Sequence, residues 1–361
     1  MSYHTSSLAT RAFERILLVK PSSLGDVLHG LPVLCGLRRR YPDARIDWLV
    51  APPFAPLIEN HPDITDVVPF DRKRFGRVAR DWSATRAFVE FLRDLRKRRY
   101  ELVIDLQGLF RSGFITRATG ADVRIGFANA REGARWFYTD LMVTDDPHMH
   151  AVDRNFLVSK MLGFEDGPRR FGLTISPEAR AGVERLLGEA GWRAGPSMIV
   201  VAPGARWETK VWPRERFAET IDQLCSNGSS RAVLVGSSED VDRCDWIREH
   251  SSAAPLSLAG RTSVPELVAV IERADLVICQ DSAPMHIAAA LDRPLVCLIG
   301  PTNPRRTGPY LRGGDVVRLP LECSPCYFRQ LSQCPHAHRC MVDLNVGLVV
   351  EAANKSAFSA V

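Results

Sequence analysis

Short apolar runs alternate with longer amphipathic stretches along most of the chain. In the first half, the runs that predict buried strands are residues 16–19, 46–50, 66–69 and 102–106. Apolar residues at helical spacing predict helices over residues 27–40 and 86–99, and the basic stretch 72–80 predicts a loop. Strands and helices that alternate in this way predict a parallel sheet covered on both faces.

A more irregular section, residues 131–172, precedes a second alternating series. Its predicted strands are residues 197–201, 232–236, 256–258, 276–279 and 295–299, and its predicted helices are 178–191, 215–225, 241–250 and 264–273. A chain of 361 residues also favours two domains. We therefore predict an α/β protein with two Rossmann-like, doubly wound domains and a cleft between them. The expected domains are residues 1–185 and 186–345, and a C-terminal helix or tail over 346–361 can pack back on the first.

Composition narrows the class of protein. The chain is 45% hydrophobic and 25% charged, as in folded soluble proteins. Residues 1–15 lack the apolar segment of a secretory signal, and no apolar run approaches the roughly 18 residues that span a bilayer. We therefore expect a cytoplasmic protein. The net charge of +5 suits an anionic substrate or a membrane surface and requires no nucleic-acid partner.

Residues 274–310 give the clearest local signal. A predicted strand leads into Asp281 and Ser282, which are good N-cap residues, and Pro284 suits the first helical turn. A helix N-terminus at a strand end gathers backbone N–H groups into an anion site. The next strand ends in a second rigid polar loop that contains Thr302, so the pair of loops suggests a nucleotide or nucleotide-sugar pocket. An ordinary, well-capped βαβ unit is the alternative.

A similar loop follows the first predicted strand. Gly25 would let the backbone approach a ligand closely, and Asp26 would bring a carboxylate that can accept a proton from a hydroxyl nucleophile. The spacing equally fits an Asp26 that only caps the following helix.

Further charged residues fall at predicted strand ends of the second half. Lys210, near Arg206, could neutralise a diphosphate leaving group, or the loop could be merely solvated. Glu239 could accept hydrogen bonds from ribose hydroxyls or act as a helix N-terminal charge. No Asp-x-Asp pair stands at a strand end, so we expect no catalytic metal.

Four segments taken in order resemble a known family. Residues 16–34, 105–113, 203–213 and 281–310 together are similar to the bacterial lipopolysaccharide heptosyltransferases, which are inverting glycosyltransferases of the GT-B fold. Residues 150–155, with 130–132 upstream, most resemble the type I enzymes that add the first heptose to the Kdo core. Where the family usually has glycine this chain has Ala283, and Pro284 removes one N–H from the expected anion site.

The resemblance implies a role for each matching residue. It implies that Asp26 is the catalytic base and that Lys210 contacts the phosphates of the donor. It implies donor contacts for Ser23, Gly25, Arg206, Glu239, Asp281, Ser282, Ala283, His286 and Thr302. It implies acceptor contacts for Gln107, Arg111, His150 and Arg154.

The implied reaction is transfer of heptose from ADP-L-glycero-β-D-manno-heptose to a Kdo- or heptose-containing lipopolysaccharide core, or a related glycan, with inversion. The alternatives are a GT-B transferase or epimerase that uses another nucleotide sugar, and a non-catalytic module that binds nucleotide sugar or metal. The expected partners are an ADP-sugar donor and an anionic glycolipid or glycan. Basic residues 72–99 could contact the inner face of the inner membrane or form a solvated surface. The oligomeric state stays open.

The cysteines fall into two groups. Five are scattered and are expected to be reduced and mostly buried: Cys35, Cys225, Cys244, Cys279 and Cys297. The other four lie within 18 residues, namely Cys323, Cys326, Cys334 and Cys340, and could hold a structural zinc or iron ion. A similar segment occurs in many relatives, and in one related group it is reported to hold iron. Free thiols or a redox pair are the alternatives.

Overall fold

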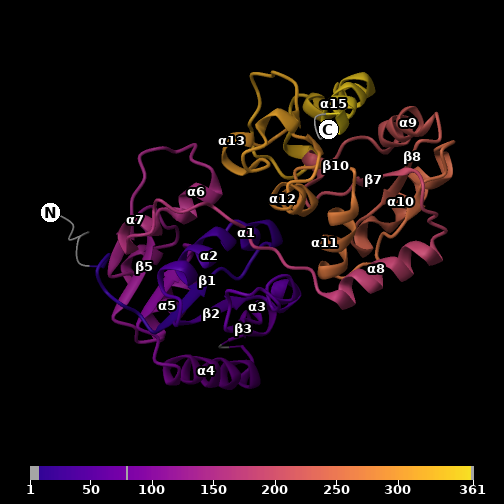
Figure 1. The fold of residues 1–361 in the computed structure, drawn as a ribbon. Helices are drawn as coiled ribbons and strands as arrows, with labels where there is room; N and C mark the ends of the chain where they lie inside the picture. Colours follow the sequence, from indigo (N-terminus) through magenta and orange to yellow (C-terminus); the bar gives the residue numbers. More distant parts are fainter. Residues whose placement is uncertain (1–7, 79, 359–361) are drawn as a thin grey trace. The chain divides into compact units, whose positions relative to one another are not determined.

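The structure, a computed structural model, describes residues 8–78 and 80–358 (Figure 1). The chain divides into two compact units, Met1–Thr174 and Ile175–Val361. Each contains one six-stranded parallel sheet with helices on its faces. Among the described helices, none combines the length and the apolar character needed to cross a bilayer.

The sheet of unit 1 has the order β3-β2-β1-β4-β5-β6. Its strands are β1 (Arg15–Val19), β2 (Arg45–Val50), β3 (Asp66–Pro69), β4 (Leu102–Asp105), β5 (Val123–Phe127) and β6 (Asp140–Met142). The order reverses between β1 and β4, which pair directly. Ligands bind at such a reversal, outside the carboxyl ends of the strands. The loops after β1 and β4 therefore occupy the favoured position for a site.

Helices cover both faces of this sheet. They are α1 (Leu24–Leu28), α2 (Leu31–Arg40), α3 (Arg72–Phe75), α4 (Trp82–Lys97), α5 (Phe110–Ala118), α6 (Ala151–Phe156) and α7 (Val158–Leu162), with the 3₁₀ segments η1 (Pro52–Leu57) and η2 (Ala134–Phe137). The side chains of β1 are buried on both faces of the sheet. Those of Leu17 and Val19 belong to the same core cluster as Leu49 and Val103. Burial of both strand faces explains why the strand sequences are continuous apolar runs.

The structure corrects four sequence predictions in this unit. The helix predicted over residues 27–40 is two helices, α1 and α2, and Pro32 in the first turn of α2 lacks the N–H that a continuous helix would need there. The predicted loop 72–80 contains the short helix α3, and α4 begins earlier than predicted because Asp81 caps it. The irregular section holds α6 and α7, which pack on α2 but are too short to show a clear period.

The sheet of unit 2 has the order β12-β11-β10-β7-β8-β9. Its strands are β7 (Ser197–Ala202), β8 (Ser230–Leu234), β9 (Leu256–Ser257), β10 (Leu276–Gln280), β11 (Leu295–Leu298) and β12 (Val316–Val317). Its helices are α8 (Pro177–Glu189), α9 (Arg214–Cys225), α10 (Val241–His250), α11 (Val264–Arg273), α12 (Ala283–Ala290), α13 (Pro304–Thr307), α14 (Arg339–Val342) and α15 (Val346–Phe358). The 3₁₀ segments are η3 (Glu208–Lys210), η4 (Ser238–Asp240), η5 (Gly313–Asp315) and η6 (Leu331–Gln333).

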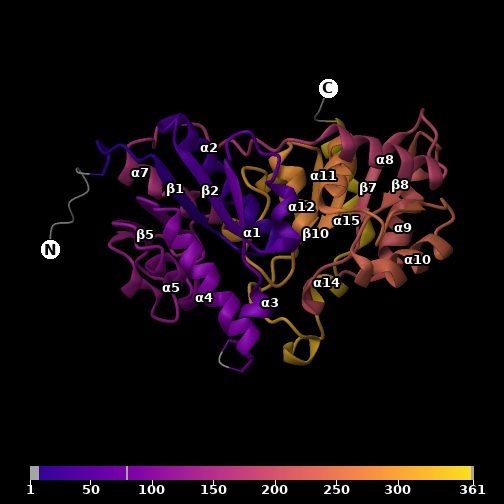
Figure 2. The same ribbon diagram turned by 90° about the horizontal axis from the view of Figure 1, so that it is seen from below.

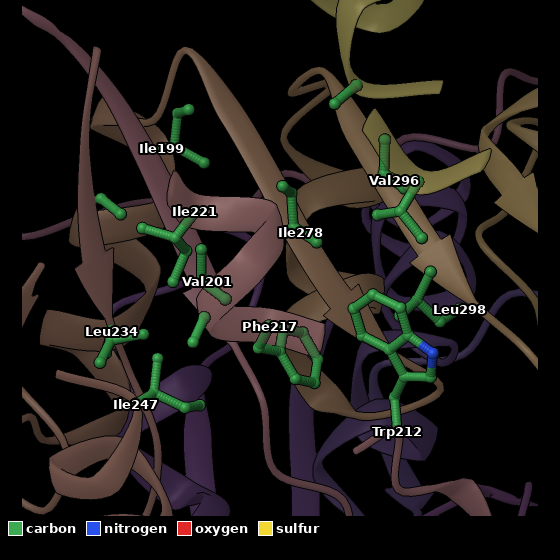
Figure 3. Packing of buried hydrophobic residues seen from close by; sticks show 14 of the residues in the cluster. Ile199, Val201, Trp212, Phe217, Ile221, Leu234, Ile247, Ile278, Val296 and Leu298 are labelled. Carbon is green, nitrogen blue, oxygen red and sulfur yellow. The ribbon is translucent and has the colours of Figure 1, made fainter. Parts of the chain in front are cut away.

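The core of unit 2 lies between this sheet and α9. In Figure 3, Val201 and Ile278 of neighbouring strands face Phe217 and Ile221 of α9, and the Trp212 indole closes one end beside Leu298. The Trp212 Nε1–H donates to Leu344 O at 2.9 Å, so the polar tip of this buried ring is satisfied.

Two domain boundaries differ from those expected from the sequence. The units meet at Thr174 and Ile175 rather than at residue 185, because α8 packs on α11 of unit 2 (Figures 1 and 2). The C-terminal segment is not a separate tail, since α15 packs against α9, β10 and β11 within unit 2. Its apolar residues Val346, Val349 and Ala353 are part of the unit 2 core.

Candidate active site

Asp26 lies in the first turn of α1, directly beyond the carboxyl end of β1. One carboxylate oxygen, Oδ2, accepts from the Ser23 N–H at 3.0 Å and from the Ser23 hydroxyl at 2.8 Å, which closes a capping box. The other oxygen, Oδ1, is 3.9 Å from Lys20 Nζ. The side chain is 45% exposed. The capping and proton-accepting roles are therefore compatible, because they use different oxygens. Gly25 is buried in the same turn.

Lys20 is a site residue that the sequence analysis missed. It is 7% exposed, and its Nζ donates to Leu106 O at 2.7 Å. Burial lowers the pKa of Lys20, and the nearby carboxylates of Asp26 and Asp105 oppose that shift. The sequence signal that could have identified Lys20 was a lysine directly after an apolar strand. A lysine buried at that position needs acidic neighbours to compensate its charge.

Asp105 supplies one of those acidic neighbours from the end of β4. It is fully buried and accepts from the N–H groups of Gln107 at 2.8 Å and Gly108 at 3.1 Å, and from the Tyr138 hydroxyl at 2.6 Å. Burial raises the pKa of Asp105 although these hydrogen bonds oppose the shift. Gly126 makes room for the Tyr138 ring, since any Cβ there would collide with it.

Two of the four predicted acceptor residues belong to α6. His150 caps this helix, its Nδ1 accepting from the Val152 N–H at 3.2 Å. Arg154 stacks 4.0 Å from the centre of the Phe127 ring and donates to Asn129 Oδ1 at 2.9 Å. Both Arg154 and Arg131 are close enough to Lys20 to lower its pKa. A cluster of cations thus surrounds the carboxyl ends of β1, β4 and β5.

The other two predicted acceptor residues lie around the start of α5. Gln107 follows β4, and its Oε1 is buried with no hydrogen-bond partner in the part of the chain that the structure describes. A buried acceptor without a partner is costly, so a donor on a bound ligand would stabilise it. Arg111 is exposed in the first turn of α5. The structure shows no contact between the described side chains of Arg111 and Lys20, so a role for Arg111 in acceptor binding stays a prediction from the resemblance.

In unit 2, three predicted residues from separate loops come together. Lys210 Nζ, at the end of η3, lies 2.7 Å from Asp281 Oδ2, and both side chains are largely buried. The Thr302 hydroxyl, after β11, bonds the same Asp281 oxygen at 2.5 Å. Lys210 also lies 4.4 Å from the centre of the Trp207 ring. This cluster is at the carboxyl ends of β7, β10 and β11.

Gln280 is a second residue that the sequence analysis missed. It is fully buried at the end of β10, where its Nε2 donates to Pro203 O at 2.6 Å and its Oε1 accepts from the Trp212 N–H. It therefore ties the loop that carries Lys210 to the strand that carries Asp281. The sequence signal that could have identified Gln280 was a polar residue at the end of an otherwise apolar strand.

Helix α12 begins at Ala283, so only the second of the two N-cap residues offered by the sequence caps it. Ser282 alone is the N-cap, and Asp281 instead turns its carboxylate to Lys210 and Thr302. Ala283 and Pro284 are the first two helical residues, so only Ala283 offers an N–H there. His286 lies in the same first turn. The anion site is thus reduced by one donor, as the sequence predicted.

Arg206 and Glu239 line a cavity of about 640 Å³ in unit 2. Trp212 and Arg243 also line it, together with acidic residues of η4 and α10. The Asp240 carboxylate accepts hydrogen bonds from the Ser237 hydroxyl and the Ser237 N–H, each at 2.8 Å. These bonds fix the loop after β8. A cavity of this size, with cations and carboxylates on its wall, suits a nucleoside.

The four C-terminal cysteines line a smaller cavity of about 250 Å³, together with His336 and Arg339. Burial and the charges of the other three thiols raise the pKa of Cys340 to about 11. The four side chains are therefore neighbours. Among the described residues, however, no three of these sulfur atoms lie within 4.8 Å of one another.

A different trio does meet that distance: Cys35, His61 and Asp63. His61 Nδ1 accepts from the Asp63 N–H at 3.2 Å, so the ring proton sits on Nε2, which donates to Phe171 O at 3.1 Å. Burial raises the pKa of Cys35 to about 12, which keeps the thiol protonated. Both ring nitrogens of His61 are thus engaged by backbone groups, so in this structure the trio forms a hydrogen-bonded cluster.

Comparison with known proteins agrees with the fold of the two units. The two parallel six-stranded sheets define a glycosyltransferase of the GT-B fold: the structure of ADP-heptose lipopolysaccharide heptosyltransferase II from Escherichia coli aligns with a TM-score of 0.75 at 25% identity, covering 96% of this chain and 99% of its own. A glycosyltransferase family 9 structure from Veillonella parvula gives a TM-score of 0.82 at 24% identity, covering 96% and 98%.

The sequence comparisons identify the family. The model of glycosyltransferase family 9 (heptosyltransferase) matches residues 88–337. Lipopolysaccharide heptosyltransferase 1 of Pseudomonas aeruginosa is 32% identical over 325 residues, which cover 86% of each chain. The chain belongs to glycosyltransferase family 9, the heptosyltransferases, as its sequence motifs predicted.

Proposed function

We propose that the enzyme transfers heptose from ADP-L-glycero-β-D-manno-heptose to a Kdo- or heptose-containing lipopolysaccharide core acceptor with inversion. The observation that carries this proposal is the Lys210–Asp281–Thr302 cluster, which lies at three strand ends of unit 2, the unit that also holds the nucleoside-sized cavity. The likeness to heptosyltransferase 1 of P. aeruginosa supports the choice of sugar.

Asp26 acts as the base. Its Oδ1 takes the proton from the acceptor hydroxyl, while Ser23 holds Oδ2 and fixes the carboxylate. The acceptor oxygen forms a bond to the anomeric carbon on the face opposite the diphosphate. The bond between that carbon and the diphosphate oxygen breaks, and ADP leaves with the electron pair.

Unit 2 stabilises the departing ADP. Lys210 carries a positive charge at the strand ends, and the N–H of Ala283 adds a donor at the N-terminus of α12. Asp281 and Thr302 bind hydroxyls of the donor sugar, and Glu239 binds the ribose. No catalytic metal takes part in this scheme.

The acceptor is anionic. Arg154 and Arg131 lie beside Lys20 at the carboxyl edge of the unit 1 sheet, with His150 on the same helix as Arg154. Guanidinium groups bind carboxylates and phosphates through paired N–H donors, which suits an acidic core sugar. The enzyme works in the cytoplasm, at the inner face of the inner membrane, where an amphiphilic acceptor would be presented.

The four C-terminal cysteines hold a structural zinc or iron ion that staples their loop. Four thiolates suit a tetrahedral ion, whose Zn–S distances are about 2.3 Å. Binding would draw the sulfur atoms together from the spacing they have in the structure. Metal analysis of the purified protein would refute this ion if nothing stoichiometric is found while all four thiols titrate.

Product analysis with several nucleotide sugars tests the proposed reaction. ADP-heptose, ADP-glucose and UDP-sugars are each incubated with enzyme and a Kdo-terminated acceptor, and thermal shift measures donor binding in parallel. We expect transfer and the largest shift with ADP-heptose, and a product of inverted configuration. Turnover with another donor, or epimerisation without transfer, would replace the proposed function with that activity.

A further inference from the structure

The four C-terminal cysteines belong to a segment, residues 323–340, that holds the loop of Lys210. The Thr209 hydroxyl donates to Phe328 O at 2.5 Å, and His338 Nε2 donates to Thr209 O at 2.7 Å. Thr209 is 2% exposed and directly precedes Lys210. Two polar groups of the residue before Lys210 are therefore bonded to residues 323–340, which we call the cysteine segment.

The cysteine segment also holds the loop after β11, which is the second loop of the Asp281 cluster. The Ser324 hydroxyl donates to Gly300 O at 2.5 Å, and the Tyr327 N–H donates to Pro301 O at 2.9 Å. The packing at Gly300 is close, since a Cβ there would lie 2.8 Å from the sulfur of a segment cysteine. One segment thus ties together two loops that come from different strands of unit 2.

Between these contacts the cysteine segment brings a second cation to the ring of Trp207. The Arg329 guanidinium lies 4.9 Å from the centre of this ring, and Lys210 Nζ lies 4.4 Å from the same centre. The ring attracts each cation, but two positive charges at one ring repel each other. An anionic ligand bound beside both cations would offset that repulsion.

The cysteine segment is also part of the wall of the nucleoside-sized cavity. Leu331 and His338 line this cavity. Glu208 lines it too, and its carboxylate accepts from the Leu331 N–H at 3.1 Å. Glu208 and Lys210 both belong to η3, so this short element contributes to the cavity wall and to the Asp281 cluster. The diphosphate of a bound donor has to lie between its nucleoside and its sugar.

We propose that Arg329 binds the diphosphate of the donor together with Lys210, and that the cysteine segment positions the two cations. Arginine binds phosphate oxygens through paired N–H donors, whereas lysine supplies a point charge. The two side chains at Trp207 therefore complement each other in a site for a diphosphate. The inference rests on the proposed function in that unit 2 binds a nucleotide sugar, and it deepens that function by adding Arg329 to the donor site.

Calorimetric titration of the full chain with adenosine, AMP and ADP tests the role of Arg329. Arg329→Gln should weaken the binding of ADP about tenfold, because a charged donor to phosphate is lost. The binding of AMP should weaken less, and that of adenosine should not change. The loss for ADP should shrink as salt rises, because Arg329 is exposed.

The matched control is Arg193→Gln, which removes an exposed arginine that precedes β7, at the amino edge of the same sheet. It should bind all three ligands as the parent does. Circular dichroism checks that the variants are folded. The role of Arg329 is overturned if Arg329→Gln binds ADP as well as the control does, or if it loses the same factor for adenosine, AMP and ADP.

A change at Thr209 tests the positioning role of the cysteine segment. Thr209→Val removes the hydroxyl that bonds Phe328 O and should weaken ADP binding about fivefold, while Thr209→Ser should restore it. In the Thr209→Val background, Arg329→Gln should cost less than it does in the parent, because the segment no longer holds Arg329 in place. Losses that simply multiply, or a Thr209→Ser variant as weak as Thr209→Val, would overturn the positioning role.

These titrations contain neither sugar nor acceptor, which keeps this inference separate from the proposed function. The same series with uridine, UMP and UDP covers an enzyme that uses another nucleotide. A loss in Arg329→Gln that follows the phosphates, in an enzyme without heptose transfer, would leave the diphosphate site standing and refute the proposed reaction. Heptose transfer by an Arg329→Gln variant with unchanged affinity for ADP would refute only the role of Arg329.

Discussion

The two units place a lysine near an aspartate at the carboxyl ends of central strands, but the two pairs differ. In unit 1, Lys20 donates to a backbone carbonyl and stays 3.9 Å from an Asp26 carboxylate that is 45% exposed. In unit 2, Lys210 contacts Asp281 directly at 2.7 Å, and the Asp281 side chain is 5% exposed. Asp281 is therefore held in a buried ion pair, whereas Asp26 keeps Oδ1 at a longer distance from its lysine.

The difference between the two pairs suggests that the two units, which have similar folds, have different chemical roles. Asp26 is anchored through one oxygen and keeps the second within reach of solvent and ligand, which suits proton transfer. The Lys210–Asp281 pair is held rigidly by Thr302 and Gln280, which suits binding and charge stabilisation. Removing each group should therefore produce a different kind of defect.

The largest expected effect follows removal of the Asp26 carboxylate. Asp26→Asn keeps the side-chain volume but cannot accept the proton, so transfer should fall about 10³-fold. Binding of ADP-sugar should be retained, because most of the proposed donor contacts, Lys210 and Asp281 among them, are in unit 2. Initial rates and calorimetric titration measure the two properties. Asp43→Asn, at an exposed aspartate of unit 1, is the control. Unaltered turnover in Asp26→Asn would refute the base assignment.

The next effect concerns the buried pair of unit 2. Lys210→Met leaves the Asp281 carboxylate buried without its cation, so unfolding free energy should fall by about 3 kcal/mol and transfer by about 10²-fold. Lys210→Met/Asp281→Asn should recover most of the stability but not the transfer. Urea unfolding and initial rates give both numbers.

The control for this prediction is Lys355→Met, which breaks an exposed pair with Glu351 on α15. Such a pair contributes about 0.5 kcal/mol or less. Recovery of transfer in the double variant would show that Lys210 matters only for folding.

How far the sequence predicted these sites depends on the type of residue. Loop residues next to apolar strands, such as Asp26, Lys210 and Thr302, stood out because polar groups at strand ends interrupt a clear pattern. Gln280 and Lys20 did not stand out, since each continues a strand and reveals its partners only when separate strands pair. Tyr138 contacts Asp105 across 33 residues, and no local pattern predicts that contact.

The same reasoning explains which parts of the fold were predicted. Continuous apolar runs gave nine of the twelve strands that the structure describes, because burial on two faces leaves a strong signal. Strands β5, β6 and β12 were not predicted. The boundary at Thr174, by contrast, depends on α8 packing on α11, which is a consequence of tertiary packing.

A smaller effect should distinguish Lys20 from Lys210. Lys20 Nζ lies 3.9 Å from Asp26 Oδ1, and its positive charge opposes protonation of that carboxylate, so Lys20→Met should move the acid limb of the pH profile of kcat/KM upward. At pH 8 transfer should fall by less than about tenfold. Rates between pH 5 and pH 9 measure the shift. An unmoved acid limb with a uniform loss of rate would mean that Lys20 only supports the fold.

The smallest expected effect concerns the hydroxyl that bonds Asp105. Tyr138→Phe removes the 2.6 Å hydrogen bond and should lower the unfolding free energy by about 1–2 kcal/mol at pH 8. The pKa of Asp105 is already raised by burial, and losing this donor raises it further. As pH is lowered, Asp105 of the folded variant then binds a proton at a higher pH than it does in the unfolded chain. The free energy of unfolding of the variant therefore falls as pH rises through the folded pKa of Asp105. The deficit should therefore be smaller at pH 5 than at pH 8.

Urea unfolding at the two pH values measures this dependence. Tyr41→Phe is the matched control, because the Tyr41 hydroxyl is buried with no hydrogen-bond partner in the described part of the chain. Its removal leaves no carboxylate short of a donor, so it should cost no stability at either pH. A deficit in Tyr138→Phe that is equal at both pH values would show that Asp105 keeps its charge without the tyrosine. The contrast between a proton-accepting unit 1 and a charge-holding unit 2 would then rest on Asp26 alone.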